Sequence, residues 1–191
     1  MGFQPFSSRP VFMTDDPDAA LVRECRAGNR RAFDQLLARY ERPVFNAAYR
    51  ILNHREDATD VTQTVFLQAY EHFGDFDPGQ RFFSWIYRIA INEALDMANG
   101  RRRAEPIAEE LASDRAGPDE ATANGQLDAG MQRALMALTL DYRTLIVLKH
   151  VQACSYEEIA VILECPVKTV KSRLFTARQA LREILLARGM V

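Results

Sequence analysis

The side chains most able to bind a charged ligand lie in one basic segment near the C-terminus. Residues 165–191 hold six Lys or Arg and one Glu, a net charge of +5, in a chain whose formal net charge is −2. The candidate contact residues lie on or beside one helix face: Lys168, Lys171, Ser172, Arg173, Phe175 and Arg178. Apolar residues occupy the other face: Val170, Leu174, Ala177 and Leu181. Positive charge segregated in this way indicates a helix that binds nucleic acid.

A capped helix and a turn precede the basic helix. Ser155 and Glu158 have the spacing of a capping box, in which each side chain bonds the backbone N–H of the other residue. Pro166 ends this helix because proline lacks the N–H that continuation requires. Helix, turn and basic helix in this order are typical of a helix-turn-helix, whose second helix enters the major groove. There, an exposed Phe175 would meet an apolar group such as a thymine methyl.

Aromatic rings gather around a loop that contains Asp77. Five of them fall within 12 residues: Phe76, Phe82, Phe83, Trp85 and Tyr87. Aromatic clusters usually form core, so at least half of these rings are expected to be buried. An exposed ring would stack on an unpaired base, which contributes roughly 1–3 kcal/mol per base.

Polar residues follow the aromatic cluster at helical spacing. Arg88 is placed to hold a phosphate, and Asn92, one turn later on the same face, is placed to bond a base edge. Arg101, Arg102 and Arg103 would attract phosphates without sequence preference. The alternative for these three arginines is a charged helix end that complements the helix dipole.

A third group of residues suits a protein partner. Asp60, Gln63, Thr64 and Leu67 follow the i, i+3, i+4, i+7 spacing of one helix face. An acid, an amide and an exposed Leu on that face suit a partner helix bearing Arg or Lys. Periodicity alone equally fits a solvated face with one exposed Leu.

Composition limits the classes of protein that this chain can represent. Its 191 residues suffice for one domain or two small ones, and 48% hydrophobic with 26% charged residues is ordinary for a soluble fold. No apolar run approaches the 18 residues of a membrane span, so no membrane insertion is expected. Three cysteines without a CxxC pair favour a reducing cytoplasm. No nucleophile–base set, phosphate-binding Gly loop or metal-ligand cluster is evident, so we expect no cofactor, no metal and no intrinsic catalysis.

The elements that position these groups are all helical, and strand patterns are nearly absent. Residues 14–103 predict a short helix ended by Gly28, a long helix bent or interrupted at Pro43, and two more, over about 56–73 and 83–99. Residues 128–191 predict a further helix, one capped by Asp141, and the helix-turn-helix. Residues 1–13 are interpreted as a disordered extension, or as residues upstream of a start at Met13.

The expected architecture is therefore all-α, with two small helical domains, 14–103 and 128–191. A flexible acidic linker of net charge −5 joins them over residues 104–127. These 24 residues span about 80 Å when fully extended but average only about 27 Å as a random coil. Two DNA sites separated by two helical turns lie about 70 Å apart, so both domains reach them together only if the linker is nearly extended.

Three motifs in order give the chain a family resemblance. They are DATDVTQTVFLQAY at 57–70, FFSWIYRIAIN at 82–92 and SYEEIA at 155–160. With the acidic linker between the second and the third, the chain resembles the extracytoplasmic-function group of bacterial RNA polymerase sigma factors over about residues 14–188.

The resemblance implies a role for each group of residues. It assigns Asp60, Gln63, Thr64 and Leu67 to the clamp helices of core RNA polymerase. It assigns the loop 76–80 and Asn92 to a base flipped out of the promoter −10 element, and it assigns Trp85, Tyr87, Arg88 and the run Arg101–Arg103 to the same element. It assigns the basic helix to the −35 element. The implied partners are core polymerase, promoter DNA and an anti-sigma factor, and the implied targets are stress-response genes. Lys171 and Thr176 stand where family members often carry Arg, which leaves the −35 sequence undefined.

Three other functions fit parts of the pattern. The first is an autonomous helix-turn-helix regulator of duplex DNA, with residues 14–103 as an effector or dimerisation domain. The others are a helical scaffold that binds only protein, and an uncharacterised enzyme. The aromatic cluster and the arginine run favour the sigma factor, because a reader of intact duplex needs no base-stacking loop.

Overall fold

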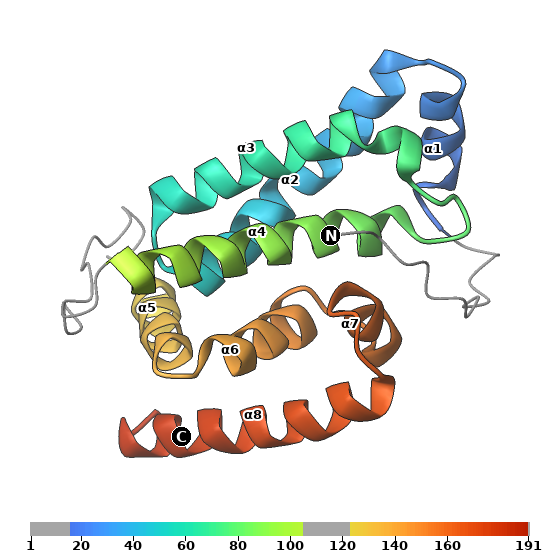
Figure 1. Ribbon diagram of the computed structural model, residues 1–191. Coiled ribbons are helices and arrows are strands. Elements are labelled where there is room, and N and C mark those ends of the chain that lie inside the picture. The colour runs from blue at the N-terminus through green and yellow to red at the C-terminus, as the bar shows by residue number, and fades with distance from the viewer. Residues whose placement is uncertain (1–15, 105–122, 191) are drawn as a thin grey trace.

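The structure is a computed structural model that describes residues 16–104 and 123–190, with the side chains of residues 102, 104 and 123–127 outside the described part. The predicted extension 1–13 and most of the predicted linker 104–127 therefore lie outside the described residues. Every regular element in the two described stretches is helical (Figure 1), as the sequence predicted.

The N-terminal domain contains four α-helices and a short 3-10 turn: α1 (Ala19–Arg26), α2 (Arg30–Leu52), α3 (Arg55–Glu71), η1 (Phe73–Asp75) and α4 (Phe82–Ala104). The C-terminal domain contains four α-helices and a π-helical turn: α5 (Ala123–Met136), α6 (Leu140–Ile146), η2 (Val147–Val151), α7 (Tyr156–Ile162) and α8 (Val167–Ala187). The predicted order of helices is confirmed in both domains.

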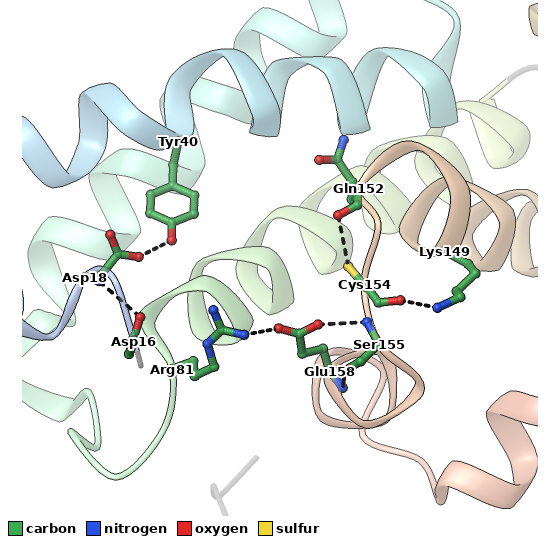
Figure 2. Close-up of polar contacts among 9 residues, drawn as sticks. All are labelled: Asp16, Asp18, Tyr40, Arg81, Lys149, Gln152, Cys154, Ser155 and Glu158. Atoms are coloured by element: carbon green, nitrogen blue, oxygen red, sulfur yellow. Dashed lines mark hydrogen bonds and ion pairs between the residues drawn. The ribbon is translucent and has the colours of Figure 1, made fainter. Parts of the chain in front are cut away.

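Local chemistry explains where the first helices begin and end. Gly28 follows α1 with a φ of +89°, a conformation that favours glycine. Asn29 caps α2 by accepting a hydrogen bond from Arg31 N at 3.1 Å. Asp18 is the N-cap residue of α1, but its side chain makes no cap bond to the helix. Its buried carboxylate instead accepts hydrogen bonds from Tyr40 and Arg39, which tie α1 to α2 (Figure 2 shows Asp18 and Tyr40).

Two helices run further than the sequence predicted. α2 is a single helix from Arg30 to Leu52 with Pro43 inside it, so the predicted interruption is not seen. Burial of an apolar face that includes Leu36 and Val44 offsets the hydrogen bond that proline removes. α4 continues past Asn99 to Ala104. Arg101 stabilises this end, because its Nη2 bonds Asp57 Oδ1 at 3.0 Å and its charge complements the helix dipole.

The helix-turn-helix forms as its sequence predicted. Ser155 Oγ accepts from Glu158 N at 3.0 Å, and Glu158 Oε2 accepts from Ser155 N at 2.8 Å, which confirms the capping box. Glu164 adopts a left-handed φ of 49° in the turn, and Pro166 is the N-cap residue of α8. One predicted cap is wrong: Thr139, not Asp141, caps α6, since its side chain accepts from Tyr142 N.

The two domains pack directly against each other. Helix α7 is in contact with α4, while α5, α6 and η2 are in contact with α2 (Figure 1). Buried apolar residues of both domains form one continuous cluster. The structure therefore presents a closed arrangement rather than two domains held apart.

Candidate nucleic-acid and protein interfaces

The basic face of α8 is open to solvent along its length. Every residue that the sequence assigned to this face is exposed: Lys168, Lys171, Ser172, Arg173, Phe175 and Arg178. Val170, Leu174 and Ala177 on the opposite face are fully buried. Phe175 is 64% exposed, an unusual environment for an aromatic ring unless it meets an apolar group. This face has the charge and the accessibility that docking into a DNA groove requires.

A residue that sequence reasoning missed positions one of these contacts. Lys171 Nζ lies 5.5 Å from the centroid of the Tyr156 ring, and Lys149 Nζ lies 4.8 Å from the same centroid. Lys149 Nζ also donates to the Cys154 carbonyl at 2.8 Å (Figure 2). Tyr156 thus holds two ammonium groups together by cation–π attraction. Because the three residues come from different elements, no spacing in the sequence predicted this cluster.

A second missed residue, His150, contacts the other end of the basic face. Arg178 Nε donates to His150 Nε2 at 3.2 Å, which requires this ring nitrogen to be unprotonated. Burial, followed by the charges of Arg178 and Lys149, lowers the pKa of His150 below its ordinary value. At neutral pH the imidazole is therefore uncharged and accepts the arginine N–H.

The aromatic cluster is mostly core. Phe76, Phe82 and Tyr87 are buried, as expected for at least half of the five rings, while Phe83 and Trp85 are partly exposed. The turn η1 places Phe76 against Trp85, with ring centroids 5.2 Å apart. The sequence assigned Phe76 and Tyr87 to DNA contact, but in this arrangement neither has a free ring face. Trp85, the third ring assigned to DNA, is partly exposed.

The polar residues near the cluster fall into two sets. Asp77 and Asn92 are exposed, and Asp77 Oδ1 accepts from Gly79 N at 2.8 Å within the loop. Arg88 is only 16% exposed, and it bonds the C-terminal domain rather than solvent. Of the arginine run, Arg103 is exposed and Arg101 is half exposed while paired with Asp57; the Arg102 side chain lies outside the described residues.

The predicted protein-binding face is present on α3. Asp60, Gln63 and Leu67 are exposed, and Thr64 is partly exposed. Leu67 is 59% exposed and Tyr70, one turn later, is 57% exposed. Tyr70 was not predicted, although its position three residues after Leu67 places it on the same face. Two adjacent exposed apolar side chains beside an acid are typical of a protein contact.

A groove lies between α5, η2 and α8. Its volume is about 580 Å³, and its apolar lining includes Met131, Leu135, Ile146, Val151, Leu181 and Leu185. Arg178 and Arg182 stand at its edge together with His150. An apolar channel with basic edges suits an amphipathic helix that carries acids beside its apolar stripe.

Metal binding, thiol catalysis and membrane insertion find little support among the described residues. In the two described stretches, no three His, Cys, Asp or Glu side chains gather as metal ligands. Burial raises the pKa of the Cys154 thiol to about 12, so it stays protonated at neutral pH and is a poor nucleophile. Within the same residues, no helix has the length and hydropathy needed to cross a bilayer.

Comparison with known proteins gives matches along both domains. The family Sigma-70 region 2 matches residues 36–104, and the family Sigma-70, region 4 matches residues 129–181. The RNA polymerase sigma-H factor of Pseudomonas aeruginosa is 32% identical over 185 residues, which cover 91% of this chain and 96% of that protein. The ECF RNA polymerase sigma-E factor of Haemophilus influenzae is 34% identical over 85% of this chain and 92% of its own length. SigW of Bacillus subtilis, also an ECF sigma factor, is 31% identical over 86% and 94%.

Solved structures resemble the fold as well, and two of them are described here. CnrH, solved in complex with the cytosolic domain of CnrY, is 31% identical with a TM-score of 0.71, over 89% of this chain and 97% of that one. The sigma factor RpoE of Bartonella quintana, solved with the anti-sigma factor NepR, is 25% identical with a TM-score of 0.67, over 80% and 96%.

Proposed function

The chain belongs to the extracytoplasmic-function group of the sigma-70 family, and from that membership we propose that α3 binds core RNA polymerase while α4 and α8 contact promoter DNA. As an alternative sigma factor, the chain directs core polymerase to promoters and starts transcription there. Its place of action is then the bacterial cytoplasm, and the bond-forming chemistry belongs to the polymerase rather than to this chain. In this proposal, the domain 14–103 binds core polymerase and the −10 element, and the domain 128–191 binds the −35 element. Residues 104–127 join the two domains.

The basic face of α8 is the single observation that best supports this function. Six candidate contact residues are exposed, while Val170, Leu174 and Ala177 on the opposite face are buried, so the helix presents one surface of defined chemistry. Lys171 and Arg178 supply charge to phosphates or to guanine edges, and Phe175 supplies an apolar surface to a thymine methyl. We propose that this surface reads the −35 element.

The −10 element is assigned to the loop 76–80 and the exposed part of α4. Asn92 offers an amide to a base edge, and Trp85 offers a ring at the edge of the aromatic cluster. Removing a base from the stack costs a few kcal/mol, which stacking and one or two hydrogen bonds offset. Arg103 and its neighbours in the run add attraction to phosphates.

A regulatory protein partner is also part of the proposal. The two solved structures compared above were each determined with a second protein, and the protein bound to the Bartonella quintana sigma factor is an anti-sigma factor. We infer that an anti-sigma factor binds this chain as well, and the basic-edged apolar groove of the C-terminal domain is a suitable surface for it. Affinity purification of the chain from its native cells should recover such an inhibitor; recovery of polymerase alone in repeated trials would count against it.

Reconstituted transcription tests the main function. Core polymerase with the purified chain should start RNA synthesis from a promoter selected in vitro, and Asn92→Ala should lower open-complex formation about tenfold or more without weakening core binding. Asp96→Ala, which alters another exposed residue of α4, is the matched control and should retain activity. A chain that fails to bind core polymerase, yet binds intact duplex with sequence specificity on its own, would establish the autonomous regulator instead.

A further inference from the structure

We propose that four arginines around the turn between α1 and α2 form a further nucleic-acid surface, which holds single-stranded promoter DNA downstream of the −10 element. They are Arg23 and Arg26 in the last turn of α1, and Arg30 and Arg31 in the first turn of α2. The inference rests on the proposed −10 contacts of α4 and extends the length of promoter that the N-terminal domain binds.

Positive charge is concentrated at this turn and is open to solvent. Residues 23–31 contain the four arginines and one glutamate, a net charge of +3 in a chain whose net charge is −2. All four arginines are exposed. Residues 27–29 alone separate the two helices, and Gly28, with its φ of +89°, allows so tight a turn. The arginines are therefore close enough together to contact one segment of nucleic acid.

Among the described residues, no carboxylate forms an ion pair with any of these arginines. The acid that lies among them in the sequence, Glu24, accepts a hydrogen bond from Asn29 Nδ2 at 2.8 Å. Other arginines of the same domain do have acidic partners: Arg39 pairs with Asp18, and Arg101 pairs with Asp57. The charge of the cluster is thus available to an external anion.

Two of the arginines occupy positions that helix electrostatics disfavours. Arg30 and Arg31 begin α2, at the positive end of its dipole, and no acid is present in that first turn. Asn29 already caps the helix, because its side chain accepts from Arg31 N and Ala32 N at 3.1 and 3.4 Å. Stabilisation of α2 therefore does not explain these arginines, whereas a phosphate beside them would offset their repulsion from the dipole.

Ring contacts connect the cluster to the proposed −10 surface. The ring centroid of Phe33, one turn after Arg30, lies 5.4 Å from that of Phe73, and the Phe73 centroid lies 6.4 Å from that of Trp85. Two ring contacts thus lead from the start of α2 to the ring proposed to stack on a −10 base. Figure 1 shows α1 and the loop before α4 at the same end of the N-terminal domain. A strand held at Trp85 reaches the arginines within a few nucleotides.

The order of the helices sets the direction of this strand. The C-terminal end of α4, with the run 101–103, leads through residues 105–122 to α5 and the domain proposed to bind the −35 element. Because the −35 element lies upstream, that end of α4 faces upstream DNA. The opposite end, with Trp85 and the neighbouring cluster, faces downstream.

Single-stranded DNA is the partner that suits this position and this chemistry. Arginine binds phosphate through forked hydrogen bonds and reads no sequence when it does so. A promoter that is melted at the −10 element presents its strand with the phosphates accessible. Tyr70, on the proposed polymerase-binding face, also contacts Phe33, with ring centroids 5.6 Å apart. An acidic surface of polymerase is therefore the competing partner, and the experiment must separate the two.

The test uses holoenzyme that contains the double variant Arg30→Ala, Arg31→Ala. The matched control, Arg42→Ala with Arg188→Ala, removes two exposed arginines from other places. Two fork-junction promoter DNAs serve as probes. In one, the single strand ends directly after the −10 element; in the other it continues for about six nucleotides, a length within one single-strand binding site. Fluorescence anisotropy over a series of salt concentrations measures binding. Separate titrations measure binding to core polymerase, and circular dichroism follows thermal unfolding.

We expect the double variant to bind the longer fork about tenfold more weakly than the wild type. The slope of log K against log salt should become less steep by about 1.4, because each of two lost phosphate contacts to single-stranded DNA contributes about 0.7. Binding to the shorter fork and to core polymerase should be unchanged, as should every measurement on the control. Thermal stability should be equal or higher, since two charges have been removed from the positive end of α2.

An equal loss of affinity for both forks would overturn the inference, because the cluster would then act outside the downstream strand. Weaker binding to core polymerase would assign the cluster to the polymerase, and unchanged binding throughout would make it a solvated surface; each of these results also overturns the inference. Failure of the proposed function would be seen in the wild type instead, as loss of binding to core polymerase and to the shorter fork, and the inference would fall with it.

Discussion

The guanidinium of Arg143 joins the two domains, because its Nη1 donates to the Ile51 carbonyl at 2.6 Å. Its other N–H groups donate to the carbonyls of Leu135, Met136 and Leu138, at 3.0, 3.0 and 3.1 Å. The side chain is 9% exposed and has backbone carbonyls as its acceptors. One buried cation thus donates hydrogen bonds to carbonyls at the C-terminal ends of α2 and α5, where both helix dipoles are negative.

Replacing Arg143 with Met should destabilise the fold strongly. Removing the guanidinium leaves several buried carbonyls without a donor, and each such group costs about 1–3 kcal/mol. We expect the free energy of unfolding to fall by about 3 kcal/mol or more, measured by urea titration. Arg133→Ala on the exposed side of α5 is the control and should stay within about 0.5 kcal/mol. A loss from Arg143→Met no larger than the control's would contradict this account.

Replacing Tyr70 with Ala should weaken binding to core polymerase. Leu67 and Tyr70 are the large exposed apolar side chains of α3, and such anchors at an interface contribute about 1–3 kcal/mol each. We expect the dissociation constant for core polymerase to rise about tenfold, measured by biolayer interferometry. Leu186→Ala, at the 50% exposed Leu186 of α8, serves as the control. If Tyr70→Ala binds as the wild type does, Tyr70 lies outside the contact.

Replacing Lys171 with Ala should change the salt dependence of promoter binding by the holoenzyme. If Lys171 contacts a phosphate, the slope of log K against log salt becomes less steep by about 0.9. Tyr156→Leu should have a smaller effect in the same direction, because it only frees the lysine to move. Arg188→Ala, at the far end of α8, should leave the slope unchanged. A weaker complex with an unchanged slope would instead indicate that Lys171 contacts a base.

Acid should destabilise the C-terminal domain through His150. The pKa of this imidazole is lowered in the folded state by burial and by Arg178 and Lys149, so the unfolded chain binds its proton more readily. The contribution to stability is present above the unfolded pKa of about 6.5 and is lost as pH falls through the lower folded value.

Urea titrations between pH 7.5 and 5 measure this effect, and His150→Gln should reduce the loss of stability on acidification. His72→Gln, at the exposed end of α3, should behave as the wild type does. Equal slopes of stability against pH for His150→Gln and the wild type would refute the assignment.

The sequence by itself determined the helices and the chemistry of their faces. The helical order, the capping box of Ser155 and Glu158, and the division of α8 into a basic face and an apolar face all follow from residues within a few positions of each other. Such patterns are set by helix periodicity and by local hydrogen bonds, so the motifs could be located without coordinates. The exposed face of α3 was predicted for the same reason.

Only the tertiary structure decided which candidate side chains are accessible. Phe76 and Tyr87 carry the right chemistry for bases but are buried, and Arg88 is engaged by Glu164 from 76 positions further along the chain. Arg143 reaches Ile51 across a separation of 92 residues. Burial and charge pairing depend on which distant surfaces meet, and helix periodicity carries no information about that meeting. The spacing of residues therefore determined which side chains share a helix face. Packing between the domains determined which of those side chains are accessible in the free chain.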